Sequence, residues 1–366
     1  MLIWDAHLDL GQGAIILHRN YLDPVHVIRQ RERNMKDFKP TLWGLGEGTL
    51  AFPEMRQSKV AVCFATLLAG VNVSSNPNLT SSDFQTIYQA YGSVQGQLAY
   101  YRALQDDGSV HILTNKDQLE NHLAEWQAWD TDELMDGEES PPLGFILATE
   151  GSDMIRSPAE LEEWHNSGLR VLMLGHFGPG KYAGGTGTDL PLNDDGIALL
   201  KEAQRLGMIL DLNHLSDQSF WQACDHFSGP VLGSHSNCRA LVPGQRQLSD
   251  EQLMVIIERN GVIGVCVDVW MLEPDWVAGV NTNEKISLET LIDHIDHICQ
   301  LAGNSAHAGI GTDLDGGYGF KQCPNDFDTI ADLQKLQGLL GKRGYSPDDI
   351  ANILYRNFMN LVLRSW

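Results

Sequence analysis

The chain opens with a histidine and an aspartate two positions apart, His7 and Asp9, within the apolar run I-W-D-A-H-L-D-L of residues 3–10. In a β-strand, residues i and i+2 point to the same side, so these two side chains would project together. Imidazole nitrogens and carboxylate oxygens are the ligands that zinc and similar divalent ions take. The pair is therefore a candidate for metal ligation, provided that the rest of the chain supplies further ligands.

Five other apolar runs end in an ionisable residue. These residues are Glu150 in F-I-L-A-T-E-G, His176 in V-L-M-L-G-H, His214 in M-I-L-D-L-N-H, His235 in V-L-G-S-H-S and Asp313 in A-G-I-G-T-D. A lone carboxylate at the end of an apolar strand is costly to desolvate unless it is paired or bound to a metal. A single histidine in such a place is more often a core residue than a ligand, but four histidines and three carboxylates at equivalent places predict a metal site.

Two metal ions that share a bridging carboxylate need about five protein ligands, with a hydroxide to complete the site. The chain offers five candidates for these positions: His7, Asp9, Glu150, His214 and His235. The spacing of 21 residues between His214 and His235 suits one helix and its return between adjacent strands. We therefore expect a binuclear centre.

Eight short apolar runs, most of them followed by a longer amphipathic segment, must position these residues. The predicted strands are residues 2–9, 60–68, 144–151, 170–177, 207–214, 230–236, 262–269 and 307–315. Helical patterns lie between most of them, for example at 195–206 and at 249–260, where Ser249 is a plausible N-cap.

Alternating strands and helices predict a parallel sheet, and eight strands in 366 residues predict a closed (β/α)8 TIM-like barrel, an α/β fold. The C-terminal ends of the barrel strands, with their ionisable residues, would then converge on one mouth. An open doubly wound sheet is the alternative, although no G-x-G-x-x-G follows the first strand. We expect a single domain over residues 1–366, with loop insertions at about 71–95 and 178–194.

Composition excludes several classes of partner. The formal net charge of −23 would repel nucleic acid and an anionic membrane surface. No apolar run reaches the roughly 18 residues of a transmembrane helix, and the N-terminus lacks the basic leader of a signal peptide. Six scattered cysteines without a C-x-x-C motif predict free, mostly buried thiols. A cytoplasmic protein is expected.

The chain resembles the membrane dipeptidase (renal dipeptidase) family of the amidohydrolase superfamily. The resemblance runs from W-D-A-H-L-D to H-A-G-I-G-T-D-L-D-G-G, with its densest matches in L-G-M-I-L-D-L-N-H, G-S-H-S-N-C-R-A-L and G-T-D-L-D-G. It implies a binuclear metallohydrolase that cleaves the peptide bond of short peptides, including dipeptides with a C-terminal D-residue, and that forms a homodimer. On matching positions, His7 and Asp9 would hold one zinc ion, His214 and His235 the other, and Glu150 would bridge them. Zinc is the expected metal, although manganese and cobalt share these ligands.

The resemblance also implies catalytic and substrate-binding residues. Two divalent ions would lower the pKa of a bridging water toward neutrality and give a hydroxide nucleophile beside Glu150. His176 matches the substrate-site histidine and would donate to the developing oxyanion. Asp313 would take the proton from the attacking water and hand it to the leaving amine. Arg246 matches the arginine that binds the substrate carboxylate, which selects short substrates.

Some of these residues have competing interpretations. Arg246 precedes a helix start and is alternatively a capping or surface arginine, and Arg239 is a rival for the substrate carboxylate. Asp315, two residues after Asp313, is expected to be structural, as is Asp5 below His7. Lys181, in the glycine-rich segment, is either solvated or near an acidic group of the substrate.

Two segments depart from the family pattern on substrate-facing loops. Residues 151–153 read G-S-D where the family commonly has G-G-H, and residues 177–182 read F-G-P-G-K-Y. Neither change removes a predicted ligand, so the prediction of a hydrolase is unaffected. The identity of the substrate is left undetermined by the sequence. The alternatives are another amide, an N-acyl amino acid or a lactone as substrate, and a non-catalytic binding protein, which the five intact ligands disfavour.

Overall fold

The computed structural model describes residues 1–36, 38, 44–71, 83–131 and 140–366. Two strands, β3 Gly70–Val71 and β4 Asp83–Phe84, form a separate small pair. The remaining strands belong to one parallel sheet: β1 Ile3–Leu8, β2 Val60–Leu68, β5 Val110–Ile112, β6 Leu143–Glu150, β7 Leu169–Met173, β8 Ile209–Asp211, β9 Val231–Leu232, β10 Ile263–Val265 and β11 Ala308–Ile310.

Eight of these strands form a barrel in the order β10-β11-β1-β2-β6-β7-β8-β9. The ring closes between β9 and β10, where Gly233 N donates to Val262 O (3.0 Å) and Gly264 N donates to Gly233 O (2.7 Å). This closure confirms the predicted (β/α)8 barrel over the open sheet. The short strand β5 pairs with the first residues of β6 and was not predicted.

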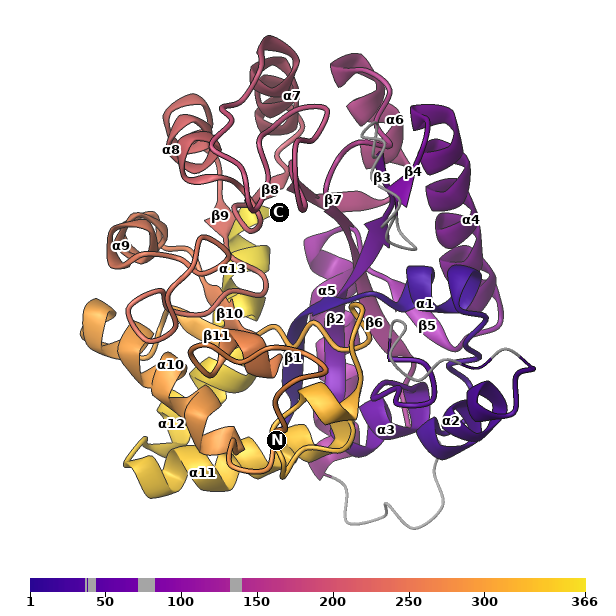
Figure 1. Cartoon of the computed structure of the whole chain (residues 1–366), viewed down its shortest axis with the longest axis vertical. Helices are drawn as coiled ribbons and strands as arrows, with labels where there is room; N and C mark the ends of the chain where they lie inside the picture. The colour runs from indigo at the N-terminus through magenta and orange to yellow at the C-terminus, as the bar shows by residue number, and fades with distance from the viewer. Residues whose placement is uncertain (37, 39–43, 72–82, 132–139) are drawn as a thin grey trace.

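The helices cover the outside of this ring, as α4, α7, α8, α9 and α10 show in Figure 1. They are α1 Leu10–Ile16, α2 Val25–Arg33, α3 Phe52–Gln57, α4 Ile87–Asp106, α5 Lys116–Thr131, α6 Leu161–Asn166, α7 Asp194–Arg205, α8 Asp217–His226, α9 Asp250–Glu258, α10 Leu288–Ala302, α11 Lys335–Arg343, α12 Pro347–Ala351 and α13 Asn357–Ser365. None of the helices in the described ranges combines the length and the apolar character needed to cross a membrane.

The helix predictions agree with α7 and α9 to within two residues at each end. Ser249 caps α9 as predicted, in a capping box with Gln252. Of the insertion predicted over 71–95, residues 72–82 lie outside the described residues, and α4 begins at Ile87. The segment 178–194 carries no strand or helix of its own before α7, as expected for a loop.

The sequence overestimates the length of five strands. His176, His214, His235 and Asp313 were placed at strand ends, yet each lies three positions after its strand, which stops at Met173, Asp211, Leu232 and Ile310 respectively. The backbone explains part of the difference, because His214 (φ 60°) and Asp313 (φ 62°) adopt the left-handed conformation, which a strand cannot contain. The strand predicted at 262–269 is likewise reduced to Ile263–Val265.

Glycines allow the strands to approach closely where the ring closes. A Cβ on Gly311, directly after β11, would lie 1.7 Å from the Ser234 carbonyl oxygen, and one on Gly264 in β10 would lie 2.0 Å from the same atom. No rotamer change relieves a clash with a backbone oxygen, so these positions require glycine. The backbone of Ser234 precedes His235, which ties barrel closure to the site.

We expect Gly311→Ala to lower the free energy of unfolding by roughly 1–3 kcal/mol or more, because the added methyl group forces the barrel backbone apart. Urea unfolding followed by circular dichroism measures this change. The matched control is Gly338→Ala in α11, where a Cβ meets nothing within 4 Å. The control should stabilise the protein by roughly 0.5–1 kcal/mol through helix propensity. Equal stability of the two variants would contradict the packing argument.

Candidate metal centre

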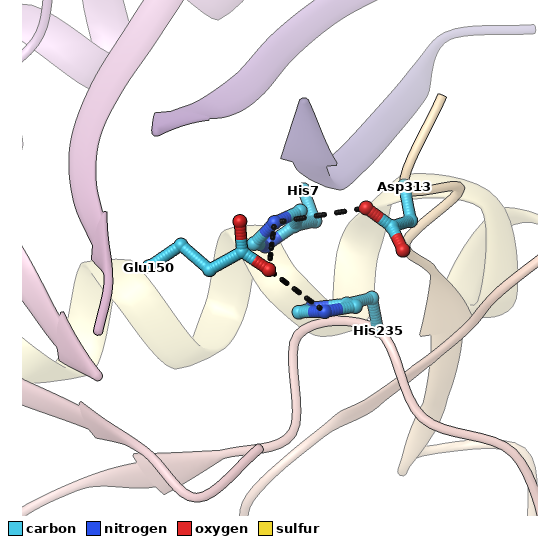
Figure 2. Close-up of side chains that lie close together, drawn as sticks. All are labelled: His7, Glu150, His235 and Asp313. Carbon is cyan, nitrogen blue, oxygen red and sulfur yellow. Dashed lines mark ion pairs between the residues drawn. The ribbon is translucent and has the colours of Figure 1, made fainter. Parts of the chain in front are cut away.

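Four histidines surround one oxygen atom of Glu150 at the mouth of the barrel. The Nε2 atoms of His7, His176, His214 and His235 lie 3.4–3.6 Å from Glu150 Oε1. Glu150 is the last residue of β6, and His7 lies near the end of β1. Figure 2 shows His7, Glu150, His235 and Asp313 extending toward one another. Side chains that are far apart in the sequence thus converge as predicted.

Two further carboxylates border the same cluster. His7 Nε2 lies 3.8 Å from Asp9 Oδ1 and 3.9 Å from Asp313 Oδ1. Thr66 of β2 donates a short hydrogen bond to Asp9 Oδ1 and fixes this carboxylate. A Cβ on Gly316 would lie 2.2 Å from Asp313 Oδ1 and 2.8 Å from Asp9 Oδ2, so this glycine leaves the room that both carboxylates occupy.

The cluster contains buried polar atoms without a partner. His7 Nε2 and Asp9 Oδ2 have no hydrogen-bond partner among the described residues, although both side chains are only 1% exposed. Buried donors and acceptors left unpaired cost about 1–3 kcal/mol each. A divalent cation would satisfy both atoms, since neutral imidazole and carboxylate are its ordinary ligands. The residues present therefore fit a metal centre.

Burial sets the protonation of the histidines. It lowers the pKa of His7, and it holds the pKa values of His214 and His235 well below the ordinary value, with the neighbouring Arg246 charge acting in the same direction. These imidazoles are therefore neutral at physiological pH and keep a lone pair for a metal. His176 is also buried enough to have a lowered pKa.

The carboxylates show the opposite shift. Burial raises the pKa of Asp9 to about 7, and repulsion from Glu150 adds to the effect. Burial and then the charges of Glu150 and Asp9 hold the pKa of Asp313 well above its usual range. Carboxylates this close together repel one another, and either a bound proton or a cation relieves the repulsion, so the arrangement is compatible with a positive ion.

A second layer of polar groups orients the histidines. Ser234 Oγ lies 2.7 Å from His235 Nδ1 and 3.3 Å from His7 Nδ1. Asp211, at the end of β8, accepts from the backbone N–H groups of Ser234 and Asn213. Such contacts to the second ring nitrogen direct Nε2 toward the centre. Asp211 is a buried carboxylate that the sequence analysis missed, although it stands in the quoted run M-I-L-D-L-N-H.

Asp5 and Asp315 are structural, in agreement with the predictions. Asp5 accepts hydrogen bonds from the backbone and hydroxyl of Thr312 and from His7 N. Asp315 pairs with the buried Arg19 at 2.7 Å and accepts from Thr49. Both carboxylates are saturated by these partners and brace the turn that carries Asp313.

Exposure separates His176 from the other histidines. Its side chain is 20% exposed, whereas those of His7, His214 and His235 are at most 2% exposed. His176 therefore presents its ring to whatever enters the mouth. The adjacent Phe177 is 55% exposed, and its ring centroid lies 4.9 Å from that of His214, so it offers an apolar surface at the entrance.

The glycine-rich segment folds back over this part of the mouth. Thr186 Oγ1 lies 3.2 Å from His214 Nδ1, and Gly185 N donates to Gly178 O. A Cβ on Gly185 would lie 1.9 Å from the His176 carbonyl oxygen, so glycine permits the close approach. Lys181 is partly exposed, and its ammonium group donates to the carbonyl oxygens of Ile155 and Arg156.

Arg246 is buried beside the cluster. It is 5% exposed and donates to His235 O (2.9 Å) and Ser236 Oγ (3.3 Å). No carboxylate of the described residues lies within 4.0 Å of its guanidinium, which leaves a buried cation without a direct anionic partner. Its rival Arg239 is bound bidentately by Asp217 at 2.8 and 3.0 Å. Arg246 is therefore not a surface residue, and Arg239 already has an anionic partner in Asp217.

Asp268 was also missed, although it follows the same rule as its neighbours. It lies three positions after β10, is 4% exposed, and accepts from Gln322 Nε2 at 2.9 and 3.0 Å. Burial raises the pKa of Asp268 to about 7, against which the charge of Arg246 acts. The predicted strand 262–269 already placed an ionisable residue near its end, which was the available signal.

A parallel barrel with imidazoles and carboxylates at the C-terminal ends of its strands belongs to the class of barrel metalloenzymes. The chain is a member of the membrane dipeptidase family, peptidase family M19, whose family model matches residues 15–365. The match begins after His7 and Asp9, so the placement of these two residues in the centre comes from the structure.

Individual relatives agree with this family. An uncharacterized dipeptidase of Schizosaccharomyces pombe is 29% identical over 229 residues, which cover 61% of this chain and 53% of the relative. The chain thus spans about half the length of that curated relative. The crystal structure of a dipeptidase described as a family M19 metallopeptidase has a TM-score of 0.77 at 23% identity, covering 100% of this chain and 99% of the other.

A second crystal structure comes from Rhodobacter sphaeroides. This metallopeptidase, solved with a phosphinate mimic of the dipeptide L-Ala-D-Ala, has a TM-score of 0.78 at 21% identity, with 100% and 99% of the two chains covered. At such identities these likenesses show the fold. Family and neighbours together support a metallo-dipeptidase that binds divalent metal, which confirms the predicted class of enzyme. The cytoplasmic location and the homodimer stay predictions.

One contact from outside the centre makes a pH-dependent contribution to stability. His294 of α10 is 1% exposed and accepts from Cys238 N (3.0 Å), which anchors the turn after His235. Burial lowers the pKa of His294 from 6.5 to about 4. Between pH 6.5 and about 4, the imidazole of His294 binds a proton in the unfolded chain but stays neutral in the folded protein. The free energy of unfolding therefore decreases as the pH falls through this range.

The variant His294→Asn keeps an acceptor for Cys238. When the pH falls from 7 to 5, we expect the free energy of unfolding of the wild type to decrease by about 2 kcal/mol more than that of the variant. Urea unfolding at the two pH values measures the difference. His26→Asn, which removes an exposed histidine of α2, is the control and should keep the wild-type slope. The same slope for all three proteins would contradict the assignment.

Proposed function

We propose that the protein hydrolyses the peptide bond of dipeptides, including those with a C-terminal D-residue, at a binuclear zinc centre. The observation that carries this proposal is the convergence of four imidazole nitrogens on Glu150 Oε1. The dipeptide mimic bound by the Rhodobacter sphaeroides structure supports the substrate class.

His7 and Asp9 would hold one ion, His214 and His235 the other, and Glu150, which contacts all the imidazoles, would bridge them. When bound, the two ions supply a hydroxide nucleophile at neutral pH and polarise the scissile carbonyl. The neutral state of the buried histidines and the unpaired His7 Nε2 and Asp9 Oδ2 support these positions.

His176 would bind the substrate. It is the most exposed of the four histidines, and a neutral imidazole carries one N–H donor. It would donate this hydrogen bond to the carbonyl oxygen as negative charge develops there, in a site from which water is largely excluded. Phe177, beside it, would contact an apolar side chain of the substrate.

Asp313 would move the proton. Its side chain is 14% exposed at the mouth, and its pKa is held well above the usual range by burial and by neighbouring carboxylates. A carboxylate of raised basicity accepts a proton from the attacking water and returns it to the leaving nitrogen. Arg246, as a buried cation without a direct anionic partner among the described residues, would bind the substrate carboxylate.

Activity and metal content test this proposal together. We expect the zinc-loaded protein to hydrolyse dipeptides with L- or D-residues at the C-terminus, to lose activity on chelation and to recover it with zinc. The same panel includes N-acyl amino acids and lactones. Glu150→Gln, close to isosteric, should lose activity and bound metal in parallel. Turnover of lactones without any dipeptide hydrolysis would overturn the dipeptidase assignment and leave the metallohydrolase assignment intact.

Arg246→Lys should raise KM for free dipeptides roughly 10- to 100-fold, because lysine cannot form the paired hydrogen bonds to a carboxylate. The wild type should also prefer a free dipeptide over the dipeptide amide, and this preference should shrink in the variant. Steady-state kinetics measure both effects. Arg239→Lys is the matched control, since Arg239 is held by Asp217, and it should leave the preference unchanged. A shared change in both variants would count against Arg246.

A further inference from the structure

A second group of metal-ligating side chains lies far from the catalytic centre. It consists of His111 in β5 and of His122 and Glu125 in α5, each with a ligand atom within 4.8 Å of the others. His111 pairs with Gly144 at the start of β6, whereas Glu150 ends the same strand. Six residues of strand separate the two places by roughly 20 Å. The group therefore lies at the opposite end of the barrel from the mouth.

His122 is held in the orientation of a metal ligand. Its ring is 2% exposed, and Nε2 lies 2.8 Å from the Ala61 carbonyl oxygen, which can only accept. The Nε2 atom therefore carries the hydrogen, and Nδ1 keeps its lone pair. An imidazole that donates one N–H to a backbone carbonyl and points the other nitrogen outward is the usual arrangement around a bound metal.

Packing leaves this ring little freedom. A Cβ on Gly144 would lie 2.5 Å from His122 Nε2, so the ring lies directly against the backbone of β6. Burial lowers the pKa of His122 to about 4, and the nearby His111 acts in the same direction. The imidazole is therefore neutral at physiological pH, with Nδ1 available.

The other two groups complete a set of three ligands. His111 Nδ1 lies 3.2 Å from His122 Nδ1. Zinc–nitrogen bonds of about 2.0–2.1 Å in a tetrahedral site put two nitrogen ligands roughly 3.3 Å apart, so the observed separation fits shared ligation of one ion. Glu125 lies three positions after His122 on the same face of α5 and is exposed, which gives an ion access from solvent.

We propose that His111, His122 and Glu125 form a peripheral binding site for a divalent cation of the zinc type, distinct from the catalytic centre. Three protein ligands leave one tetrahedral position for water. An ion bound there joins α5 to β5 and stabilises this end of the barrel without taking part in hydrolysis. The alternative is a direct hydrogen bond between the two Nδ1 atoms with no affinity for metal.

Metal stoichiometry distinguishes these possibilities. After dialysis against zinc and removal of free metal, elemental analysis should find one more ion per chain in the wild type than in His111→Ala. Glu125→Gln should weaken binding of that ion at least about tenfold in calorimetric titrations with zinc, since even outer partners of a metal contribute that much. His26→Ala, which removes an exposed histidine of α2, should keep the wild-type count.

Dipeptidase activity provides the check on folding. His111→Ala and Glu125→Gln should keep wild-type kcat and KM, and zinc should raise the thermal midpoint less in either variant than in the wild type. Equal zinc content and equal affinity in the wild type and both variants would overturn the peripheral site. The test depends on a difference between variants, so it holds whatever number of ions the catalytic centre binds and whatever substrate the enzyme prefers.

Discussion

The burial of Glu150 among four imidazoles is the constraint on which the rest of the structure depends. A carboxylate at 4% exposure, with two further carboxylates nearby, is unfavourable unless positive charge is brought to it. The histidines are neutral through burial, so they cannot provide that charge. A bound proton or a cation relieves this conflict, and a divalent cation does so with the carboxylates ionised and the imidazoles neutral. The mouth of the barrel is therefore suited to bind cations. Without a cation, the surrounding fold must offset the cost of burying these carboxylates.

The barrel holds these side chains in place because its strands form a rigid, closed ring. Buried parallel strands form a closed ring, and the candidate functional groups lie where that ring ends. Residues three positions beyond β7, β8, β9, β10 and β11 all point polar groups at the mouth. Outside them, Ser234, Asp211 and Asp5 hold the backbone and the second ring nitrogens. The positions of the candidate ligands are thus set by hydrogen bonds that do not involve a metal.

The loops beside the cluster are less regular than the barrel. Thr186 of the glycine-rich segment contacts His214. This contact requires glycine at position 185, because a Cβ there would clash with the carbonyl oxygen of His176. Lys181 and Asp153, which differ from the family pattern, have structural partners here: the Lys181 backbone N–H donates to Asp153, and the Lys181 ammonium group donates to the Ile155 carbonyl oxygen. Phe177 is exposed beside the cluster, whereas Arg246 and Asp268 are buried near it, and the charge of Arg246 acts on the pKa of Asp268.

The amino-acid sequence by itself determined the fold class and predicted the candidate site residues. Apolar runs that recur with helices between them specify a parallel barrel, and ionisable residues at the ends of such runs are conspicuous because they are costly to bury. The seven residues His7, Asp9, Glu150, His176, His214, His235 and Asp313 were identified in this way, and the structure brings them together.

Tertiary structure alone decided how these residues meet. The strands end earlier than their apolar runs, and two of the residues beyond them, His214 and Asp313, adopt the left-handed backbone conformation. Only partners distant in sequence distinguish Arg246 from Arg239. Arg239 is paired with Asp217, whereas Arg246 is buried and donates to the carbonyl oxygen of His235. Asp211 and Asp268 could be recognised as part of the cluster only from their burial. The contact between His111 and His122 depends on the register of β5 on β6. Local patterns record which residues are costly to bury, whereas long-range packing determines which of them share a site.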